Sequence, residues 1–397
     1  MNTLQKKIIA LFLALGLALG MVGALFFITQ KVREDRRPVL ILRNFNDLGG
    51  FNFQIYQVQS ALQFCEKSKA KYRLVVLFDS GLYKEDRPHF VKDNPYYNKI
   101  DWFSYYFEPI NQTNKPLSYW KKWVDEHPDI EGVVGADIDK KEMANSVKVF
   151  NFNSYQSLGQ EIRSVKEFPR IWRRYFILRP HVQKMVDNFK QKNHFSKKYK
   201  IGIQYRGTDK FHFKSSHEDY PQHPPYAFCA ALVKKVIQTN QYPPHEVVVF
   251  GASDEQSFIN YMKKQGVNFV CTDAIRSTLN TSGEDQDFSQ CEQFTYNGTA
   301  ESKRYNRLVK ESVHLGMKEK SGYIKGLDVL LDVILLGSCD MLIKSRGSVG
   351  NQAFWIQDIN GASKICKGAG VIDLASEFNA YKKKSKSGKN WKTIYQN

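Results

Sequence analysis

Cysteine is scarce in this chain, with six residues in 397, all far apart. A small scaffold built on disulfides needs a denser set, so that class of protein is excluded. No two cysteines have the spacing of zinc ligands, which excludes a zinc-finger-like site. Cys65, Cys229 and Cys339 lie in apolar runs and are expected to be small core residues. Cys271 and Cys291 flank a polar loop and can pair in an oxidising compartment.

Acidic residues are also few relative to basic ones: 40 Asp and Glu against 58 Lys and Arg leave a net charge of +18. Such a charge suits an anionic partner, which can be a nucleic acid, a lipid surface or a phosphorylated metabolite. The sequence has no internal repeats and no recognisable nucleic-acid motif, so no nucleic-acid partner is expected. Part of the charge lies in residues 376–397, which we interpret as a flexible basic tail, with contact to anionic lipid as the alternative.

Long apolar runs are absent except near the start, where Ile8 to Thr29 is bounded by basic residues on both sides. At about 1.5 Å per residue, such a helix crosses a hydrocarbon core of about 30 Å. We therefore expect residues 1–37 to be a cytoplasmic stub and transmembrane anchor of a single-pass type II membrane protein, with a Golgi or ER lumenal domain in a eukaryote. A cleaved signal peptide is the alternative, since small residues occur at Gly20 and Gly23. Sequons that permit lumenal glycosylation lie at Asn111, Asn280 and Asn297.

The first half of the remaining chain alternates strand and helix patterns. Pro38 to Leu42 is typical of a short buried strand, a helix is expected after Gly50, and Tyr72 to Phe78 is typical of a second strand. This order is the signature of a parallel sheet. Lys84 to Asp129 is aromatic and weakly periodic, so we expect an irregular surface segment, and Gly132 to Gly135 suits another short strand.

The second half repeats the alternation more regularly, after a helical pattern from Phe168 to Lys190 and a polar connector from Gln191 to Tyr199. Strands are expected at 200–205, 246–251, 267–271 and 339–343, and helices at 226–237, 254–265, 327–335 and from 352. We therefore predict an α/β protein with two Rossmann-like domains facing one cleft, an acceptor-side domain at 38–190 and a nucleotide-sugar-binding domain at 199–375.

The sharpest local feature is the sequence Arg206-Gly207-Thr208-Asp209-Lys210, which ends an apolar strand. Ligands bind outside the carboxyl ends of strands in open parallel sheets, so Arg206 is placed to hold a diphosphate. Its guanidinium is a planar fork of donors that stays charged and neutralises a leaving group. Gly207 lets the backbone approach the ligand. A surface ion pair between Arg206 and Asp209 is the alternative.

Further polar groups follow later strands of the second half. Asp254 comes after the strand at 246–251 and is either a helix N-cap or a ligand-facing acid. Asp328 and Asp332 share one helical face, which is either a site for a base or ribose or a solvated acidic face. Ser345 and Ser348 precede a helix, whose N-terminal amides suit a phosphate.

The order of these segments resembles the superfamily of GDP-fucose-dependent fucosyltransferases with a GT-B fold, which includes α1,6-fucosyltransferases, rhizobial chitin-oligosaccharide fucosyltransferases and protein O-fucosyltransferases. The family's His-x-Arg-Arg-Thr-Asp-Lys is similar to Gln204 to Lys210, its Ala-Thr-Asp-Asp to Ala252 to Glu255, and its Leu-Asp to Ser-Ser block to Leu331 to Ser348. A weaker similarity joins the family's Gly-rich turn to Gly49, Gly50 and Asn52.

The resemblance implies roles for individual residues. Arg206 corresponds to the arginine on the donor diphosphate, Asp332 to an aspartate near guanosine, and Ser348 to a phosphate-facing serine. Gln204, Gly207, Asp209, Lys210, Asp254, Asp328, Ser345, Gly49, Gly50 and Asn52 complete the expected donor site. The chain departs from the family where Gln204 replaces histidine, Gly207 the second arginine, Glu255 an aspartate and Val349 a glutamine.

The activity implied is transfer of fucose from GDP-fucose, or of another sugar from its nucleotide, to a hydroxyl of a glycan or glycoprotein, with inversion and without metal or cofactor. Glu218 and Asp219 are the candidates for contact with the acceptor hydroxyl. A metal-dependent GT-A enzyme using Asp137 and Asp139, which form a DxD triplet, is one alternative. The other is a non-catalytic, membrane-tethered protein that binds carbohydrate or nucleotide.

Overall fold

The computed structural model describes residues 37–43, 50–68, 71–81, 83–84, 99–127, 147–151, 167–207, 224–277, 321–345, 347–357 and 370–385. The chain forms two compact units, one of residues 1–43, 61–77 and 110–163, the other of residues 44–60, 78–109 and 164–397. Within the described residues, no helix is both long and apolar enough to cross a membrane. The expected anchor at 8–29 lies outside them, and the expected domain limits at 190 and 199 stay predictions.

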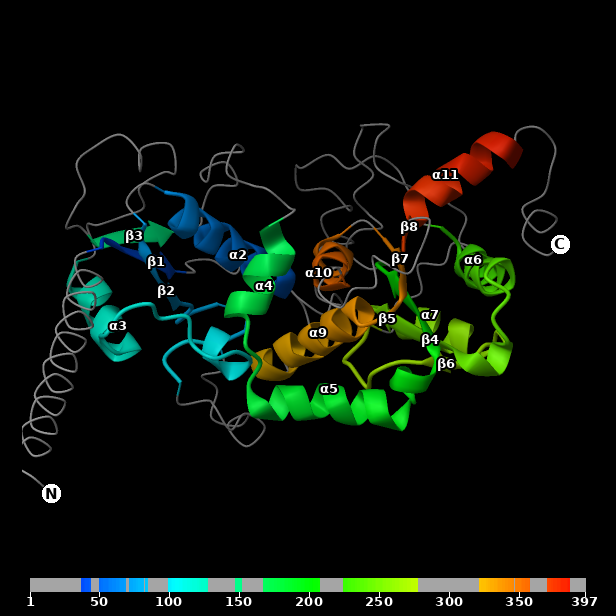
Figure 1. Cartoon of the computed structure of the whole chain (residues 1–397), viewed down its shortest axis with the longest axis horizontal. Helices are drawn as coiled ribbons and strands as arrows, with labels where there is room; N and C mark the ends of the chain where they lie inside the picture. The colour runs from blue at the N-terminus through cyan, green and yellow to red at the C-terminus, as the bar shows by residue number, and fades with distance from the viewer. Residues whose placement is uncertain are drawn as a thin grey trace, which may run out of the picture. The chain divides into compact units, whose positions relative to one another are not determined.

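The smaller sheet has three parallel strands in the described residues, in the order β2-β1-β3 (Figure 1). β1 is Val39–Arg43, β2 is Arg73–Leu77 and β3 is Val147–Asn151. Between β1 and β2 the chain forms α2, Phe51–Lys67. The strands predicted at 38–42 and 72–78, and the helix between them, are confirmed. β3 was not predicted, and the strand expected at 132–135 lies outside the described residues.

Residues 99–127 are folded, and 101–107 are buried, so the expectation of an irregular surface segment is wrong there. They contain a 3-10 turn, η2 (Phe103–Tyr105), and a helix, α3 (Leu117–Glu126), which buries Trp120 and Val124. The fully buried rings lie close together along the chain: Trp102, Phe103, Tyr105, Tyr106 and Phe107. Aromatic side chains bury a large area each, so this segment enters the core without the periodicity of a long helix or strand.

The larger sheet is doubly wound, with the order β6-β5-β4-β7-β8 and every described pair parallel. The strands are β4 (Tyr199–Tyr205), β5 (Val247–Ser253), β6 (Phe269–Val270), β7 (Met341–Lys344) and β8 (Val371–Asp373). The helices that connect or follow them are α6 (Tyr226–Thr239), α7 (Gln256–Lys263), α9 (Gly322–Gly337), α10 (Ser348–Gln357) and α11 (Leu374–Ser385). Strand order reverses between β4 and β7, where such sheets bind their ligands. The predicted parallel α/β order of the second half is confirmed.

Alternation along β4 separates the two faces of this sheet. Ile201, Ile203 and Tyr205 belong to a core cluster that also includes buried side chains of α6, α7 and α11. Gly202 points to the other face, where a Cβ would lie 3.1 Å from the Sγ of Cys339. Because glycine stands at 202, the end of α9 packs closely on β4. Helices cover both faces of the larger sheet (Figure 1).

Two helices differ from the predicted pattern. The helical stretch from 168 to 190 is interrupted, giving α4 (Phe168–Tyr175) and α5 (Pro180–Lys192), because Pro180 suits the first turn of a new helix. The tail expected from residue 376 begins inside α11, whose Leu374 and Phe378 are buried in the core cluster.

Within the described residues Cys65, Cys229, Cys271 and Cys339 are free thiols.

Candidate functional site

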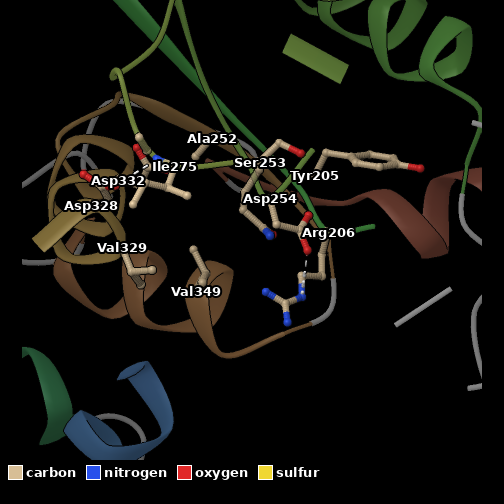
Figure 2. A pocket seen from close by; sticks show the side chains of 12 residues that line it. Tyr205, Arg206, Ala252, Ser253, Asp254, Ile275, Asp328, Val329, Asp332 and Val349 are labelled. Atoms are coloured by element: carbon tan, nitrogen blue, oxygen red, sulfur yellow. Dashed lines mark hydrogen bonds and ion pairs between the residues drawn. The ribbon is translucent and has the colours of Figure 1, made fainter. Parts of the chain in front are cut away.

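A pocket opens at the carboxyl end of the larger sheet, where its strand order reverses. Figure 2 shows its lining, which comes from the ends of β4 and β5, the loop after β6, and the facing sides of α9 and α10. The lining residues are Gln204, Tyr205, Arg206, Ala252, Ser253, Asp254, Ala274, Ile275, Asp328, Val329, Asp332 and Val349. The predicted site residues Gln204, Arg206, Asp254, Asp328 and Asp332 are thus brought together in one unit.

The basic end of the pocket is formed by Arg206 at the end of β4. The Nε of Arg206 lies 3.4 Å from Asp254 Oδ2, and the backbone N–H of Gly207 donates to Asp254 Oδ1 at 2.9 Å. Helix α7 begins after Glu255 and has no side-chain cap, so Asp254 is not its N-cap. The Asp254 carboxylate instead holds the Arg206 side chain and the Gly207 backbone at the pocket, and Figure 2 shows its contact with Arg206.

Ser345 fastens the ends of β4 and β7 to each other. Its hydroxyl accepts from the backbone N–H of Arg206 at 3.2 Å and donates to the carbonyl of Gln204 at 3.1 Å. Its own N–H donates to Gln204 Oε1 at 3.1 Å. Ser345 is buried and fixes the backbone that carries Arg206, whereas Ser348 is exposed at the first residue of α10.

The acidic end of the pocket is formed by Asp328 and Asp332, one turn apart on α9 (Figure 2). Asp332 Oδ1 accepts from the hydroxyl of Thr272 at 2.7 Å, and Asp328 Oδ2 accepts from the N–H of Ile275 at 2.8 Å. Burial raises the pKa of Asp332 to about 7 and that of Asp328 to about 6, although Arg276 lowers both. The interpretation as a solvated acidic face is therefore wrong, because Asp332 is only 8% exposed.

The start of α2 belongs to the same compact unit as the pocket. The N–H of Phe51 donates to the hydroxyl of Tyr83 at 2.7 Å, directly after Gly50. Burial raises the pKa of Tyr83, while the Phe51 N–H and the positive charge of Arg206 lower it. Arg206 therefore acts electrostatically on the Tyr83 hydroxyl. In the described part of the chain, neither amide atom of Asn52 has a hydrogen-bond partner, although Asn52 is only 3% exposed.

Several predicted residues lie outside the described residues: Gly49, Asp137, Asp139, Asp209, Lys210, Glu218, Asp219 and the sequons at Asn280 and Asn297. The sequon at Asn111 is described, and its side chain donates to the carbonyl of Lys115 and accepts from Thr113. Among the described side chains, no three His, Cys, Asp or Glu residues group as metal ligands would.

No family model and no curated protein matches the chain. Similar solved structures include those of fucosyltransferases. The α-1,6-fucosyltransferase NodZ, of Bradyrhizobium, co-crystallized with GDP, is 14% identical with a TM-score of 0.42, over 80% of this chain and 92% of that one. Arabidopsis thaliana FUT1 with GDP is 12% identical with a TM-score of 0.40, over 83% and 72%. POFUT1 with GDP is 9% identical with a TM-score of 0.40, over 85% and 98%.

Some residues of the pocket region were not expected from the sequence. Thr272, Ile275 and Arg276 follow β6 and take part in the acidic end. The rule that ligands bind beyond strand ends applies to this loop as well, so its position after a strand was the available signal. Tyr83 gave no such signal, because its bond to Phe51 joins residues 32 apart in the sequence.

Proposed function

We propose that this chain is a fucosyltransferase-like glycosyltransferase that binds a nucleotide-sugar donor, GDP-fucose by motif resemblance, in the pocket between Arg206 and the Asp328 and Asp332 pair. The observation that carries the proposal is the placement of Arg206 at the strand-order reversal, in one pocket with the carboxylates of Asp328 and Asp332. A nucleotide needs these two environments, a cation for its diphosphate and acceptors for the N–H groups of its base.

The diphosphate is assigned to the basic end. Arg206 offers a charged fork of donors, and its backbone is held by Ser345 while Asp254 holds its side chain. A preorganised cation stabilises negative charge better than a mobile one, because it needs no rearrangement when the charge develops. Asn52, with its unpartnered buried amide among the described residues, is a further candidate for a polar contact to the donor.

The base is assigned to the acidic end. One oxygen of Asp328 and one of Asp332 are used by the loop after β6, which leaves the second oxygen of each as an acceptor. Guanine presents adjacent N–H donors along one edge, and the remaining oxygens of the two carboxylates are the acceptors proposed for them. Val329, Val349 and Ile275 supply apolar contact between the two ends.

The proposed reaction is an inverting transfer. The acceptor hydroxyl attacks the anomeric carbon, a base takes the hydroxyl proton, and the bond from that carbon to the diphosphate oxygen breaks. Arg206 neutralises the departing nucleoside diphosphate, so the scheme needs no metal or cofactor. Glu218 and Asp219 remain the proposed bases, and a hydroxyl of a glycan or glycoprotein remains the proposed acceptor.

The proposed setting is a GT-B-like enzyme with two Rossmann-like domains. Residues 8–29 are proposed to anchor it as a single-pass type II membrane protein, with its catalytic part in the Golgi or ER lumen of a eukaryote. The apolar run between basic residues supports this proposal.

The test is calorimetric titration of the full chain with GDP and GDP-fucose, followed by a transfer assay over a panel of glycan acceptors. Arg206→Ala is expected to weaken GDP binding by about tenfold or more, since a charged hydrogen-bonding fork is lost. Arg170→Ala, which removes an exposed arginine paired with Glu167 on α4, is the matched control and should bind normally.

Two results would change the conclusion. If GDP does not bind, or binds equally well to the Arg206→Ala variant, the donor site is elsewhere and the proposal fails. If GDP-fucose binds at the pocket but neither transfer nor hydrolysis occurs over a wide acceptor panel, the non-catalytic binding protein is the better description.

A further inference from the structure

The loop between β6 and residue 277 is held from within by one arginine. Arg276 Nη1 donates to the carbonyl of Ala274 at 3.0 Å. Its Nη2 donates to the carbonyl of Thr272 at 2.9 Å and to the Thr272 hydroxyl at 3.3 Å. A planar guanidinium that bonds two carbonyls of the same short loop restricts that loop to one shape.

The same loop is also tied to α9 by the two acids of the pocket. Thr272 donates its hydroxyl to Asp332, and Ile275 donates its N–H to Asp328. Arg276 therefore shares Thr272 with Asp332. In the same loop, Ala274 and Ile275 line the pocket. The position of the acidic end thus depends on Arg276, which does not line the pocket.

Arg276 also acts on the charge of the acidic end. Burial raises the pKa values of Asp328 and Asp332, and the positive charge of Arg276 opposes that rise in both. Asp273 raises the pKa of Asp328, and Asp328 in turn raises the pKa of Asp332. Titratable groups that sense these acids include the Cys271 thiol and the Tyr106 hydroxyl, whose pKa values are raised mainly by burial. Arg276 is the cation that counters these effects.

We propose that Arg276 is a positioning residue for the base-binding half of the pocket: it fixes the Thr272 to Ile275 loop against Asp328 and Asp332 and keeps that end anionic. The inference rests on the proposed function, because the base is assigned to this end only if a nucleotide binds. It predicts that Arg276 affects the recognition of the nucleoside and has no effect on the recognition of the diphosphate, which is assigned to Arg206.

The experiment compares two probes, GDP and inorganic pyrophosphate, by calorimetric titration of the full chain at pH 8. Arg276→Ala should weaken GDP binding by about tenfold, since charge-assisted hydrogen bonds that shape the loop are lost. Its affinity for pyrophosphate should stay within about twofold of wild type, because no group at the basic end has changed. Arg206→Ala should weaken the binding of both probes.

A pH profile separates positioning from a general loss of stability. The pH at which GDP binding falls by half should move upward in Arg276→Ala by about one pH unit, because the acids have lost a nearby cation. Arg276→Lys should keep the wild-type midpoint, since its charge remains, while still binding GDP more weakly through loss of the planar fork.

Arg179→Ala is the matched control for stability. Arg179 Nε donates to the carbonyl of Ser104 at 3.1 Å and its Nη1 to Glu108 at 2.9 Å, so it also fixes backbone away from the pocket. This variant should melt at a lower temperature and bind GDP normally. If Arg276→Ala does not fold, Arg276→Lys carries the test through the GDP-to-pyrophosphate ratio.

The outcomes are distinct. If wild type binds neither probe, the proposed function fails. If wild type binds both and the folded Arg276 variants bind GDP with the wild-type affinity and pH midpoint, the inference about Arg276 is overturned and the donor site stands. If GDP and pyrophosphate weaken together in those variants, Arg276 stabilises the whole pocket and its assignment to the base is wrong.

Discussion

Glu255 occupies the space that a side chain at position 207 would need. A Cβ built on Gly207 would overlap the Glu255 carboxylate, which is fully buried and accepts a hydrogen bond from the hydroxyl of Tyr226. These two positions are both departures from the fucosyltransferase motifs, where an arginine and an aspartate stand. The structure relates the two departures to each other, because the longer acid at 255 fits only beside a residue at 207 that has no side chain.

This relationship predicts that substitutions at 207 and 255 are coupled. Gly207→Ala should lower the free energy of unfolding by about 1–3 kcal/mol, the range for inserting an atom into a packed site. Glu255→Asp shortens the acid by one methylene, so Gly207→Ala should cost less in its presence. Denaturant unfolding of the four proteins in a double-mutant cycle measures the coupling. Additive effects would show that the carboxylate moves aside freely.

The raised pKa values of the acidic end predict a pH-dependent affinity. Base N–H groups need ionised carboxylates as acceptors, and the pKa values are about 7 for Asp332 and about 6 for Asp328. GDP affinity should therefore be constant above pH 8 and fall as pH drops through 7 and 6, by up to about tenfold per pH unit for each proton taken up. Calorimetry from pH 8.5 to 5.5 measures this.

The control for that profile is Asp332→Asn, since the phosphates of GDP also titrate. The variant should bind GDP more weakly at pH 8 and show a shallower pH dependence than wild type. An identical slope in the two proteins would mean that Asp332 does not titrate on binding.

Stability should change with pH in the opposite direction. A carboxyl whose pKa is raised from 3.8 to about 7 on folding binds its proton more tightly in the folded state, so its contribution is favourable at low pH and is lost as pH rises through 7. Without nucleotide, Asp332→Asn should therefore be more stable than wild type at pH 8 by on the order of 2 kcal/mol. The difference should vanish near pH 4. A less stable variant at pH 8 would contradict the raised pKa.

Two buried amides on α2 predict a contrast between binding and stability. Asn52 is 3% exposed and Gln59 is 0% exposed, and within the described residues neither side-chain amide has a hydrogen-bond partner. A buried unpaired amide costs about 1–3 kcal/mol, so Gln59→Leu should stabilise the protein and leave GDP affinity unchanged. Asn52→Ala should weaken GDP-fucose binding, because Asn52 follows Phe51, whose N–H donates to Tyr83, and the charge of Arg206 acts on Tyr83. Equal affinities in both variants would remove Asn52 from the donor site.

The sequence was most informative where a single rule controls the structure. Apolar strands that end in polar residues predicted the edge at which Arg206, Asp254 and the α9 acids gather, because all strands of a parallel sheet end on one side. The sequence was less informative about which polar side chains are buried. Asp332 lies on the less apolar face of α9, yet the loop after β6 covers it, and a contact between residues 60 apart has no local pattern.

Packing through aromatic rings was also invisible to periodicity. Trp102 to Phe107 are buried around a 3-10 turn, which has neither the spacing of a strand nor that of a long helix. The backbone contacts of Ser345 could not be predicted for a related reason. Its place before a helix predicts contact with phosphate, which stays a prediction. Its hydrogen bonds to the end of β4 depend on strand order, which has no local pattern.

Ser345 gives the last prediction, on how the position of Arg206 is controlled. Ser345→Ala leaves the Arg206 N–H and the Gln204 carbonyl without this partner and should lower the free energy of unfolding by about 1 kcal/mol. Because that backbone carries the guanidinium, pyrophosphate affinity should also fall, by about threefold to tenfold.

Ser338→Ala is the matched control, since its hydroxyl donates to the carbonyl of Ile334 at 2.7 Å at the end of α9, outside the pocket lining. It should lose a similar amount of stability and bind pyrophosphate normally. Thermal unfolding and calorimetry of the two variants separate the effects. A stability loss in Ser345→Ala with unchanged affinity would mean that Asp254 alone is sufficient to hold Arg206 in place.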